Sequence, residues 1–226
     1  IMLMRNKLSL QALTKTIMGF VFICVLLFLP AGTFHYWNAW LFMAVLFVPM
    51  IILGIVMLFK SPDLLKKRLD AKEKEGEQKW VVALSGIMFM AAFVVAALNF
   101  RFSWHLLPDC VIWISVAMFL LSYLMYAEVI RENAFLSRTI EVQENQKVID
   151  TGLYGIVRHP MYSATIILFL SIPLILGSLI SFFIMLAYIP IIAIRINNEE
   201  RVLEKGLKGY KEYKQKVKYR LNPFVW

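Results

Sequence analysis

Residues 152–200 read GLYGIVRHPMYSATIILFLSIPLILGSLISFFIMLAYIPIIAIRINNEE, a long apolar block between two polar ends. The apolar block, residues 161–194, is too long for one membrane span, because a spanning helix needs roughly 20 residues. Near its middle it carries Pro173 and Gly177-Ser178, which are residues that kink a helix or form a turn. The stretch therefore predicts a hairpin of two short helices whose polar ends lie close together.

The rest of the chain is also unusually apolar. Of its 226 residues, 60% are hydrophobic and 17% are charged, whereas an ordinary soluble domain is apolar for about half of its residues. Four uncharged runs of about the length of a span precede the hairpin, at residues 16–30, 37–59, 80–100 and 111–127. We predict an all-α integral membrane protein that crosses the bilayer several times, with about six transmembrane helices.

The positive charges are distributed unevenly between the two sides of these predicted spans. All of the 24 Lys and Arg residues except Arg101 precede the first span, lie in residues 60–79 or 131–158, or follow residue 194. Loops on the cytoplasmic side are enriched in Lys and Arg. Both termini and both polar ends of the hairpin are therefore predicted to be cytoplasmic. The net charge of +9 then indicates topology and contact with anionic membrane lipids, rather than nucleic-acid binding.

The sequence divides into two functional regions within one structural domain. Residues 1–130 hold four transmembrane helices and a charged cytoplasmic loop, 60–79, in which Pro62 is suited to the first position of a short helix. Residues 131–226 form the candidate catalytic region. After the hairpin, apolar residues recur every three or four positions over residues 199–219, which predicts a C-terminal amphipathic helix lying at the membrane interface.

Charged and aromatic side chains gather at the two polar ends of the hairpin. Pro160 suits the first turn of a helix, whose N-terminus favours an anion, and Arg158 and His159 lie beside it. At the other end, Glu199 suits a cation, and Arg195, one turn earlier, suits an acidic group on a second ligand.

Two tyrosines, Tyr154 and Tyr162, flank Pro160 and offer ring faces for stacking and cation-π contact. A ligand that carries a carboxylate, an ammonium, a sulfonium and an adenine is S-adenosylmethionine. It is therefore the cofactor that these residue types favour. Neither a disulfide nor a metal site is predicted, since Cys24 and Cys110 are isolated in sequence.

Three motifs occur in the same order as in a known family. They are Gly152-Leu-Tyr154-Gly-Ile-Val-Arg-His-Pro-Met-Tyr162, then Arg195-x-x-x-Glu199-Glu200, then Tyr210-Lys-Glu-Tyr213-Lys-Gln-Lys-Val217. In this combination the chain resembles the isoprenylcysteine carboxyl methyltransferase family of integral membrane enzymes. The first 130 residues match that family only as generic membrane helices.

The resemblance implies transfer of a methyl group from S-adenosylmethionine to a lipophilic or prenylated acceptor that enters from the bilayer, with a carboxylate as the favoured acceptor group. It implies catalytic roles for Arg195 and Glu199, with Arg195 binding the substrate. The cofactor-binding residues that it implies are Gln146, Lys147, Val148, Ile149, Tyr154, His159, Pro160, Met161, Tyr162 and Glu199. Gln146 departs from the family, whose isoprenylcysteine-specific members tend to have His there, and Gln143 aligns with a family glutamine only across a gap.

The expected reaction is an in-line displacement at the methyl group of the cofactor. A carboxylate acceptor is already nucleophilic, so positioning of donor and acceptor supplies most of the rate. An amine or hydroxyl acceptor would need a general base, and Glu200 and His159 are the nearest candidates.

Two other functions remain open from the sequence. Membrane sterol reductases that use NADPH share the Arg-His-Pro-x-Tyr pattern and an ending similar to Tyr219-Arg-Leu-Asn-Pro223, although an Arg-Asp-Glu of theirs is replaced here by Asn198-Glu-Glu. A non-enzymatic transporter or scaffold is the second alternative. The absence of ionisable residues inside the predicted spans weighs against a transport pathway.

Overall fold

The computed structural model describes residues 2–69, 76–104, 106–136, 140, 142–224 and 226. The described residues fold into helices without a β-strand, apart from an isolated bridge between Leu106 and Ser178. The predicted all-α class is confirmed. In chain order the elements are α1 (Met2–Ala31), α2 (Trp37–Lys60), α3 (Pro62–Leu69), α4 (Gly76–Phe102), α5 (Asp109–Glu132), the 3-10 helix η1 (Gly152–Gly155), α6 (Pro160–Ile175), α7 (Leu179–Met185), α8 (Tyr188–Gly206) and α9 (Tyr210–Lys216).

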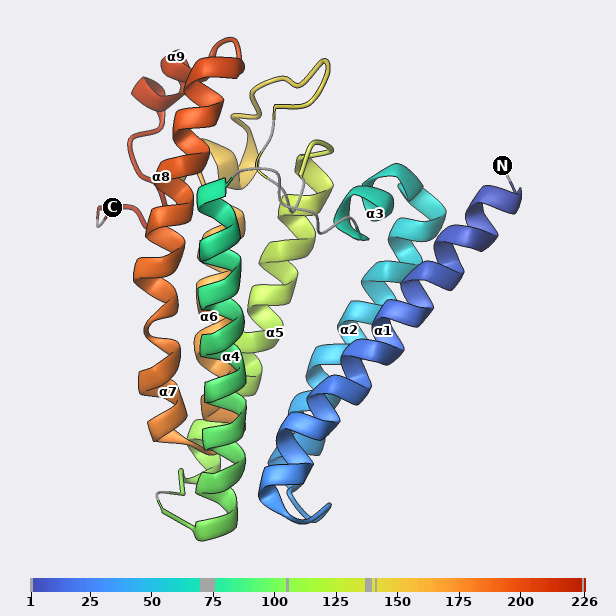
Figure 1. The fold of residues 1–226 in the computed structure, drawn as a ribbon. Helices are drawn as coiled ribbons and strands as arrows, with labels where there is room; N and C mark the ends of the chain where they lie inside the picture. The colour runs from blue at the N-terminus through green and yellow to red at the C-terminus, as the bar shows by residue number, and fades with distance from the viewer. Residues whose placement is uncertain (1, 70–75, 105, 137–139, 141, 225) are drawn as a thin grey trace.

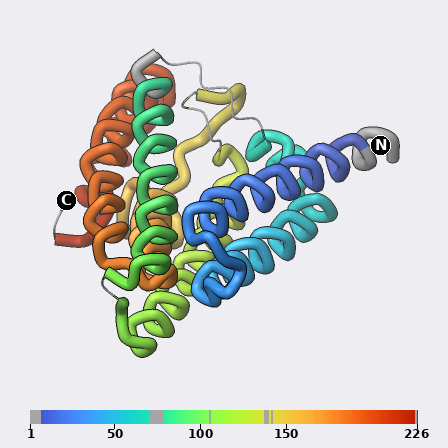
Figure 2. The backbone as a smooth tube through the Cα atoms, turned by 60° about the horizontal axis from the view of Figure 1, so that its bottom comes forward, coloured from blue at the N-terminus to red at the C-terminus, as the bar shows by residue number. Residues whose placement is uncertain are grey.

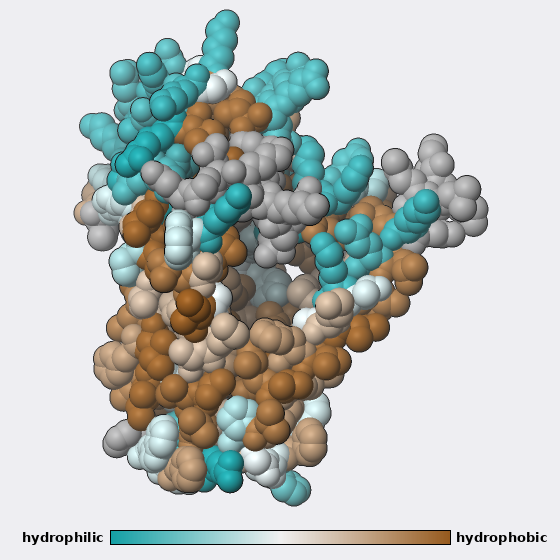
Figure 3. Space-filling model, in the orientation of Figure 1, coloured by the Kyte–Doolittle hydropathy of each residue, from teal (hydrophilic) through white to brown (hydrophobic). Residues whose placement is uncertain are grey.

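Five helical segments are long and apolar enough to cross a membrane. Four of them fall within α1, α2, α4 and α5, and the fifth, Leu179–Gly206, consists of α7 and α8 in succession. The sixth apolar helix, α6, has only 16 residues. The two arms of the hairpin therefore differ in length. The first arm is the short helix α6, and the second arm, α7 and α8 together, has 28 residues and extends past the start of α6 into the polar region. Figure 3 shows hydrophobic side chains around the middle of the molecule and most of the hydrophilic ones at one end.

The turn between α6 and α7 lies where Pro173 and Gly177-Ser178 predicted it. Gly177 has φ +78°, a left-handed conformation that glycine adopts without strain, and the Ser178 side chain accepts a hydrogen bond from the Ser181 amide. The beginning of α2 holds this turn in place. The Tyr36 hydroxyl donates to the Leu176 carbonyl at 2.6 Å, and the Asn38 amide donates to the Ile175 carbonyl at 2.9 Å. These bonds satisfy carbonyls at the end of α6 that have no partner within the helix.

The largest hydrophobic core among the described residues joins α1, α2, α4, α5, α6, α7 and α8, with Phe42, Phe119 and Ile196 fully buried within it. Away from this core, α1 and α2 lean apart from the other helices toward the N-terminus (Figures 1 and 2). The short helix predicted to start at Pro62 is confirmed as α3, whose Leu64 is buried against the end of α5. The rest of the predicted 60–79 loop lies partly outside the described residues.

The C-terminal region differs from the single helix expected over residues 199–219. Helix α8 ends at Gly206, and α9 begins after Gly209, which has φ +85°. Leu207, Tyr210 and Tyr213, whose spacing indicated a surface facing the bilayer, are buried against Val142 and Val148 of the same chain. The apolar periodicity was real, but a loop of the protein covers this face. Because α9 has 7 residues and its apolar face packs inward, it is not an extended interfacial helix.

Candidate functional site

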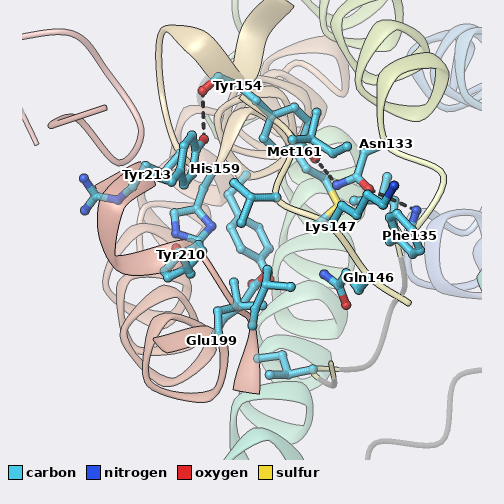
Figure 4. Close-up of a pocket in the computed structure, with 18 residues that line it drawn as sticks. Asn133, Phe135, Gln146, Lys147, Tyr154, His159, Met161, Glu199, Tyr210 and Tyr213 are labelled. Atoms are coloured by element: carbon cyan, nitrogen blue, oxygen red, sulfur yellow. Dashed lines mark hydrogen bonds between the residues drawn. The ribbon is translucent and has the colours of Figure 1, made fainter. Parts of the chain in front are cut away.

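A polar pocket lies where three segments of the C-terminal half meet. The first segment follows α5, the second leads into α6, and the third runs from the end of α8 into α9 (Figure 4). The lining residues are Asn133, Phe135, Leu136, Ile140, Gln146, Lys147, Val148, Ile149, Tyr154, Arg158, His159, Met161, Tyr162, Glu199, Leu203, Leu207, Tyr210 and Tyr213.

The C-terminal tail holds the entry to α6 in place. Helix α6 begins at Pro160, so the residues just before it need partners from outside the helix. The backbone amide of Arg158 donates to the Tyr219 carbonyl, and that of His159 donates to the Arg220 carbonyl, each at 2.9 Å. Residues 219 and 220 of the C-terminal tail thus pair directly with the Arg-His-Pro motif.

A buried carboxylate, Glu200, joins the same segments through ionic contacts. Its Oε1 accepts from Arg158 Nε at 2.8 Å and lies 3.2 Å from His159 Nε2. Its Oε2 lies 3.1 Å from the Arg220 guanidinium and 3.6 Å from Lys214 Nζ. Arg158 also donates to the Val217 and Lys218 carbonyls at 2.7 Å. Glu200 is only 2% exposed, and both of its oxygens contact basic side chains, so this network ties the entry to α6 to the C-terminal tail.

A chain of hydrogen bonds links the pocket to the adjacent part of α8. The Tyr162 hydroxyl donates to Glu199 Oε2 at 2.6 Å and accepts from Arg195 Nε at 3.0 Å. The His159 ring stacks on Tyr162 with centroids 5.8 Å apart. Glu199 faces the pocket, whereas Arg195, one helical turn earlier, is not part of its lining. Tyr162 therefore connects a carboxylate inside the pocket with a guanidinium next to it.

Tyr154 anchors the wall opposite Glu199. Asn133 at the end of α5 donates to the Tyr154 hydroxyl at 2.9 Å, and the Tyr213 hydroxyl donates to the Tyr154 carbonyl at 2.8 Å. Burial raises the pKa of Tyr154 to about 12, so its hydroxyl stays protonated at neutral pH. The Gln146 side-chain oxygen accepts from the Gln143 amide at 2.8 Å, which shapes the turn leading into Lys147.

The pocket brings together most of the residues that the sequence proposed for a cofactor. Gln146, Lys147, Val148, Ile149, Tyr154, His159, Met161, Tyr162 and Glu199 all line it. Pro160 does not line it: this residue is buried at the first position of α6, where it starts the helix. Gln143 is also outside the lining, and its side chain donates to the Phe135 carbonyl.

Two groups of lining residues were not proposed from the sequence. Asn133, Phe135, Leu136 and Ile140 lie in irregular chain after α5, where no periodicity marks a role. Leu203, Leu207, Tyr210 and Tyr213 carried a visible signal, the apolar spacing of the C-terminal region, but this spacing was attributed to contact with lipid. Arg158 was considered for an anion and instead pairs with Glu200.

The region that forms this pocket is similar in sequence to known proteins. Residues 110–209 match the family model described as phospholipid methyltransferase. A curated relative, the Delta(14)-sterol reductase TM7SF2 of Mus musculus, is 31% identical over 91 residues, which are 39% of this chain and only 22% of the reductase, so the chain spans about a fifth of that relative's length.

Among solved structures, a eukaryotic intramembrane Ras methyltransferase, isoprenylcysteine carboxyl methyltransferase, aligns with 96% of this chain and 85% of its own, at 16% identity and a TM-score of 0.47. The match to the family model includes α5, both helices of the hairpin and most of the pocket. Residues 110–209 are thus similar to the phospholipid methyltransferase family, which agrees with the predicted resemblance to integral membrane methyltransferases.

Proposed function

We propose that this protein is an S-adenosylmethionine-dependent methyltransferase that acts on a lipophilic, membrane-embedded acceptor. The observation that carries the proposal is the Arg195–Tyr162–Glu199 chain, which places a basic group directly beside a pocket with a carboxylate in its wall. Glu199 suits a positively charged group of the methyl donor, and Arg195 suits a negatively charged group of the acceptor. The two ligands would then lie side by side, as methyl transfer requires. The family match over residues 110–209 supports the same reaction class.

The chemistry of the pocket lining fits the proposed cofactor. Glu199 is the carboxylate for its ammonium group, and among the described residues its hydrogen-bond partner is a neutral tyrosine, Tyr162. Tyr154 and Tyr162 provide aromatic faces, while Leu203 and Leu207 provide an apolar wall for an adenine ring. When bound, the cofactor supplies a sulfonium-activated methyl group, and the pocket residues hold that group in a fixed direction.

Arg195 is the proposed acceptor-binding residue. Its guanidinium is partly buried on α8 and within hydrogen-bond distance of Tyr162, so an acidic acceptor held by it would lie next to the donor pocket. A carboxylate needs no deprotonation before it attacks a methyl group. A carboxylate acceptor, as in isoprenylcysteine carboxyl methylation, is therefore the finer form of the proposal. It also agrees with the engagement of Glu200 by Arg158 and Arg220, which leaves that carboxylate unsuited to act as a base.

The proposed acceptor enters from the bilayer. Figure 3 shows an opening between the α1–α2 pair and the other helices, below the hydrophilic end of the molecule, with apolar side chains along its lower edge. Many apolar side chains on α1 and α2 are exposed, including Val48, Ile52 and Ile55 on α2. These surfaces suit contact with lipid and passage of a hydrophobic tail.

Donor binding is tested by calorimetry on detergent-purified protein with S-adenosylmethionine and, separately, NADPH. We expect S-adenosylmethionine to bind, and Glu199→Gln to weaken it about 10- to 100-fold, the loss typical of a hydrogen bond to a charged group. The matched control is Glu204→Gln, about one and a half turns further along α8, where the carboxylate pairs with Lys214 at 2.5 Å and does not line the pocket. Equal weakening by both variants would contradict the proposed role of Glu199.

A membrane reductase that uses NADPH is the second candidate, favoured by the 31% identity with the Mus musculus sterol reductase. Binding of NADPH without binding of S-adenosylmethionine in the same experiment would select the reductase. The match covers only 22% of that relative, which is too little to assign its cofactor to this chain. Direct comparison of the binding of the two cofactors therefore separates the candidates.

A further inference from the structure

Tyr210 has a buried hydroxyl that the protein itself does not satisfy. Its side chain lines the pocket and is only 4% exposed, yet among the described residues its hydroxyl oxygen has no hydrogen-bond partner. A buried polar group without a partner is destabilising, and a phenylalanine ring would pack equally well at this position against Tyr213, 5.8 Å away between ring centroids. The hydroxyl therefore lowers the stability of the ligand-free fold, and packing of the ring gives no reason for its presence.

The surroundings of Tyr210 favour a hydrogen-bond donor. Burial, and then the negative charges of Glu200 and Glu199, raise its pKa well above the usual range, so the hydroxyl remains protonated. Arg158 and Glu200 are already engaged with each other. Figure 4 shows Tyr210 and His159 on the same side of the pocket, across from Gln146 and Lys147.

If Glu199 binds the ammonium group of the ligand, the carboxylate of the same ligand lies close to the Tyr210 hydroxyl. In an amino acid the carboxylate is attached to the same carbon as the ammonium group. A ligand that places its ammonium at Glu199 therefore brings an anionic oxygen within a few bonds of that site. This oxygen needs hydrogen-bond donors, because Glu199 and Glu200 are themselves negative.

Resting on the function proposed above, we propose that the Tyr210 hydroxyl is a binding group for the methyl donor and donates a hydrogen bond to the carboxylate of its amino-acid end. The residue thereby gives the pocket selectivity for a nucleoside that carries an amino-acid group over the bare thionucleoside.

The test uses Tyr210→Phe, which removes only the hydroxyl, in the full-length detergent-purified protein. Affinity is measured for S-adenosylhomocysteine, which has the amino-acid end, and for 5′-methylthioadenosine, which lacks it. We expect the variant to bind the first ligand about 10- to 100-fold more weakly. It should bind the second as the unmodified protein does, and its melting temperature without ligand should be equal or higher, since an unsatisfied group has been removed.

Tyr213→Phe is the matched control, because Tyr213 also lines the pocket but donates to the Tyr154 carbonyl at 2.8 Å. This control should lower the melting temperature without ligand. Unchanged affinity of Tyr210→Phe for S-adenosylhomocysteine, or an equal loss for both ligands, would overturn the role of Tyr210 while leaving the methyltransferase proposal in place. Failure of the unmodified protein to bind S-adenosylhomocysteine and S-adenosylmethionine would overturn both.

Discussion

At the scale of single residues, Glu200 makes more ionic contacts than any other described residue of the site. It contacts Arg158, His159, Arg220 and Lys214 while being nearly inaccessible to solvent. Removing one partner of a buried pair leaves an uncompensated charge, at a cost of about 3–5 kcal/mol. We therefore expect Glu200→Ala to lower the melting temperature of the purified protein strongly, as followed by its intrinsic fluorescence.

The control for this prediction is Glu128→Ala. Glu128 pairs with Arg131 at 2.5 Å, but both side chains are exposed, so solvent screens their interaction. We expect only a small change in melting temperature. If the two variants melted at the same temperature, the network around Glu200 would not hold the start of α6 as described.

The buried hydroxyl of Tyr154 predicts an alkaline limit to stability. Its pKa is raised by burial from 10.0 to about 12. Below pH 10 it is protonated in both the folded and the unfolded chain, and its contribution to the free energy of unfolding is fully present. Between pH 10 and about 12 only the unfolded chain ionises, so this contribution is lost as the pH rises.

The measurement is the difference in near-ultraviolet tyrosinate absorbance between the unmodified protein and Tyr154→Phe during a pH titration. We expect the difference to develop near pH 12 in the folded protein and near pH 10 in denaturant. A midpoint near 10 in both conditions would mean that Tyr154 is exposed to solvent.

At the scale of elements, the junction of α8 and α9 controls the loop that forms one wall of the pocket. A Cβ at Gly206 would lie 2.9 Å from Val142 Cγ2, too close for an undisturbed contact. Alanine would otherwise favour the helix by about 0.5–1 kcal/mol. We expect Gly206→Ala to shift the loop that continues to Gln146 and Lys147, and so to weaken S-adenosylmethionine binding in calorimetry.

The double variant Val142→Ala/Gly206→Ala tests whether this contact is the cause. Removing the two methyl groups of Val142 makes room for the new Cβ, so binding should recover toward that of Val142→Ala alone. Absence of recovery would separate the effect of Gly206 from the position of the loop.

The sequence predicts the helices and the turn between α6 and α7, but it does not predict how the α8–α9 junction packs. Apolar run length predicted the spans, and Pro173 with Gly177 predicted the turn, because both signals are local. The spacing of Leu207, Tyr210 and Tyr213 predicted an apolar face but not its partner, since helical periodicity does not distinguish lipid from protein. The covering loop has no period of its own, so Asn133 and Phe135 could not be assigned to the pocket from sequence.

The candidate site was predictable to a similar extent. Resemblance to a family led to Gln146, Tyr154, His159 and Glu199, which the structure brings into one pocket. The burial of Glu200 could not be deduced, because its partners Arg158 and Arg220 come from distant segments and approach only after the hairpin has closed. Adjacent glutamates therefore acquired different surroundings, one in the pocket wall and one in a buried ionic network.

At the scale of the whole molecule, charge distribution predicts the orientation in the membrane. The tail after α8 is rich in Lys, whereas the start of α5 is at the opposite end of the helices (Figure 1). Positive residues are retained on the cytoplasmic side. We therefore expect α9 and the pocket to face the cytoplasm and Cys110, at the start of α5, to face the other side.

Two exposed positions test this orientation with a membrane-impermeant maleimide. Cys110 is exposed, so it should react in sealed, right-side-out vesicles of the unmodified protein. In a Cys110→Ser background, Lys208→Cys, on the exposed side of the α8–α9 junction, should react only in inverted or permeabilised vesicles. The reverse pattern would place the pocket outside the cytoplasm. A cytoplasmic donor such as S-adenosylmethionine could not then reach it, so the experiment tests the proposed chemistry as well as the topology.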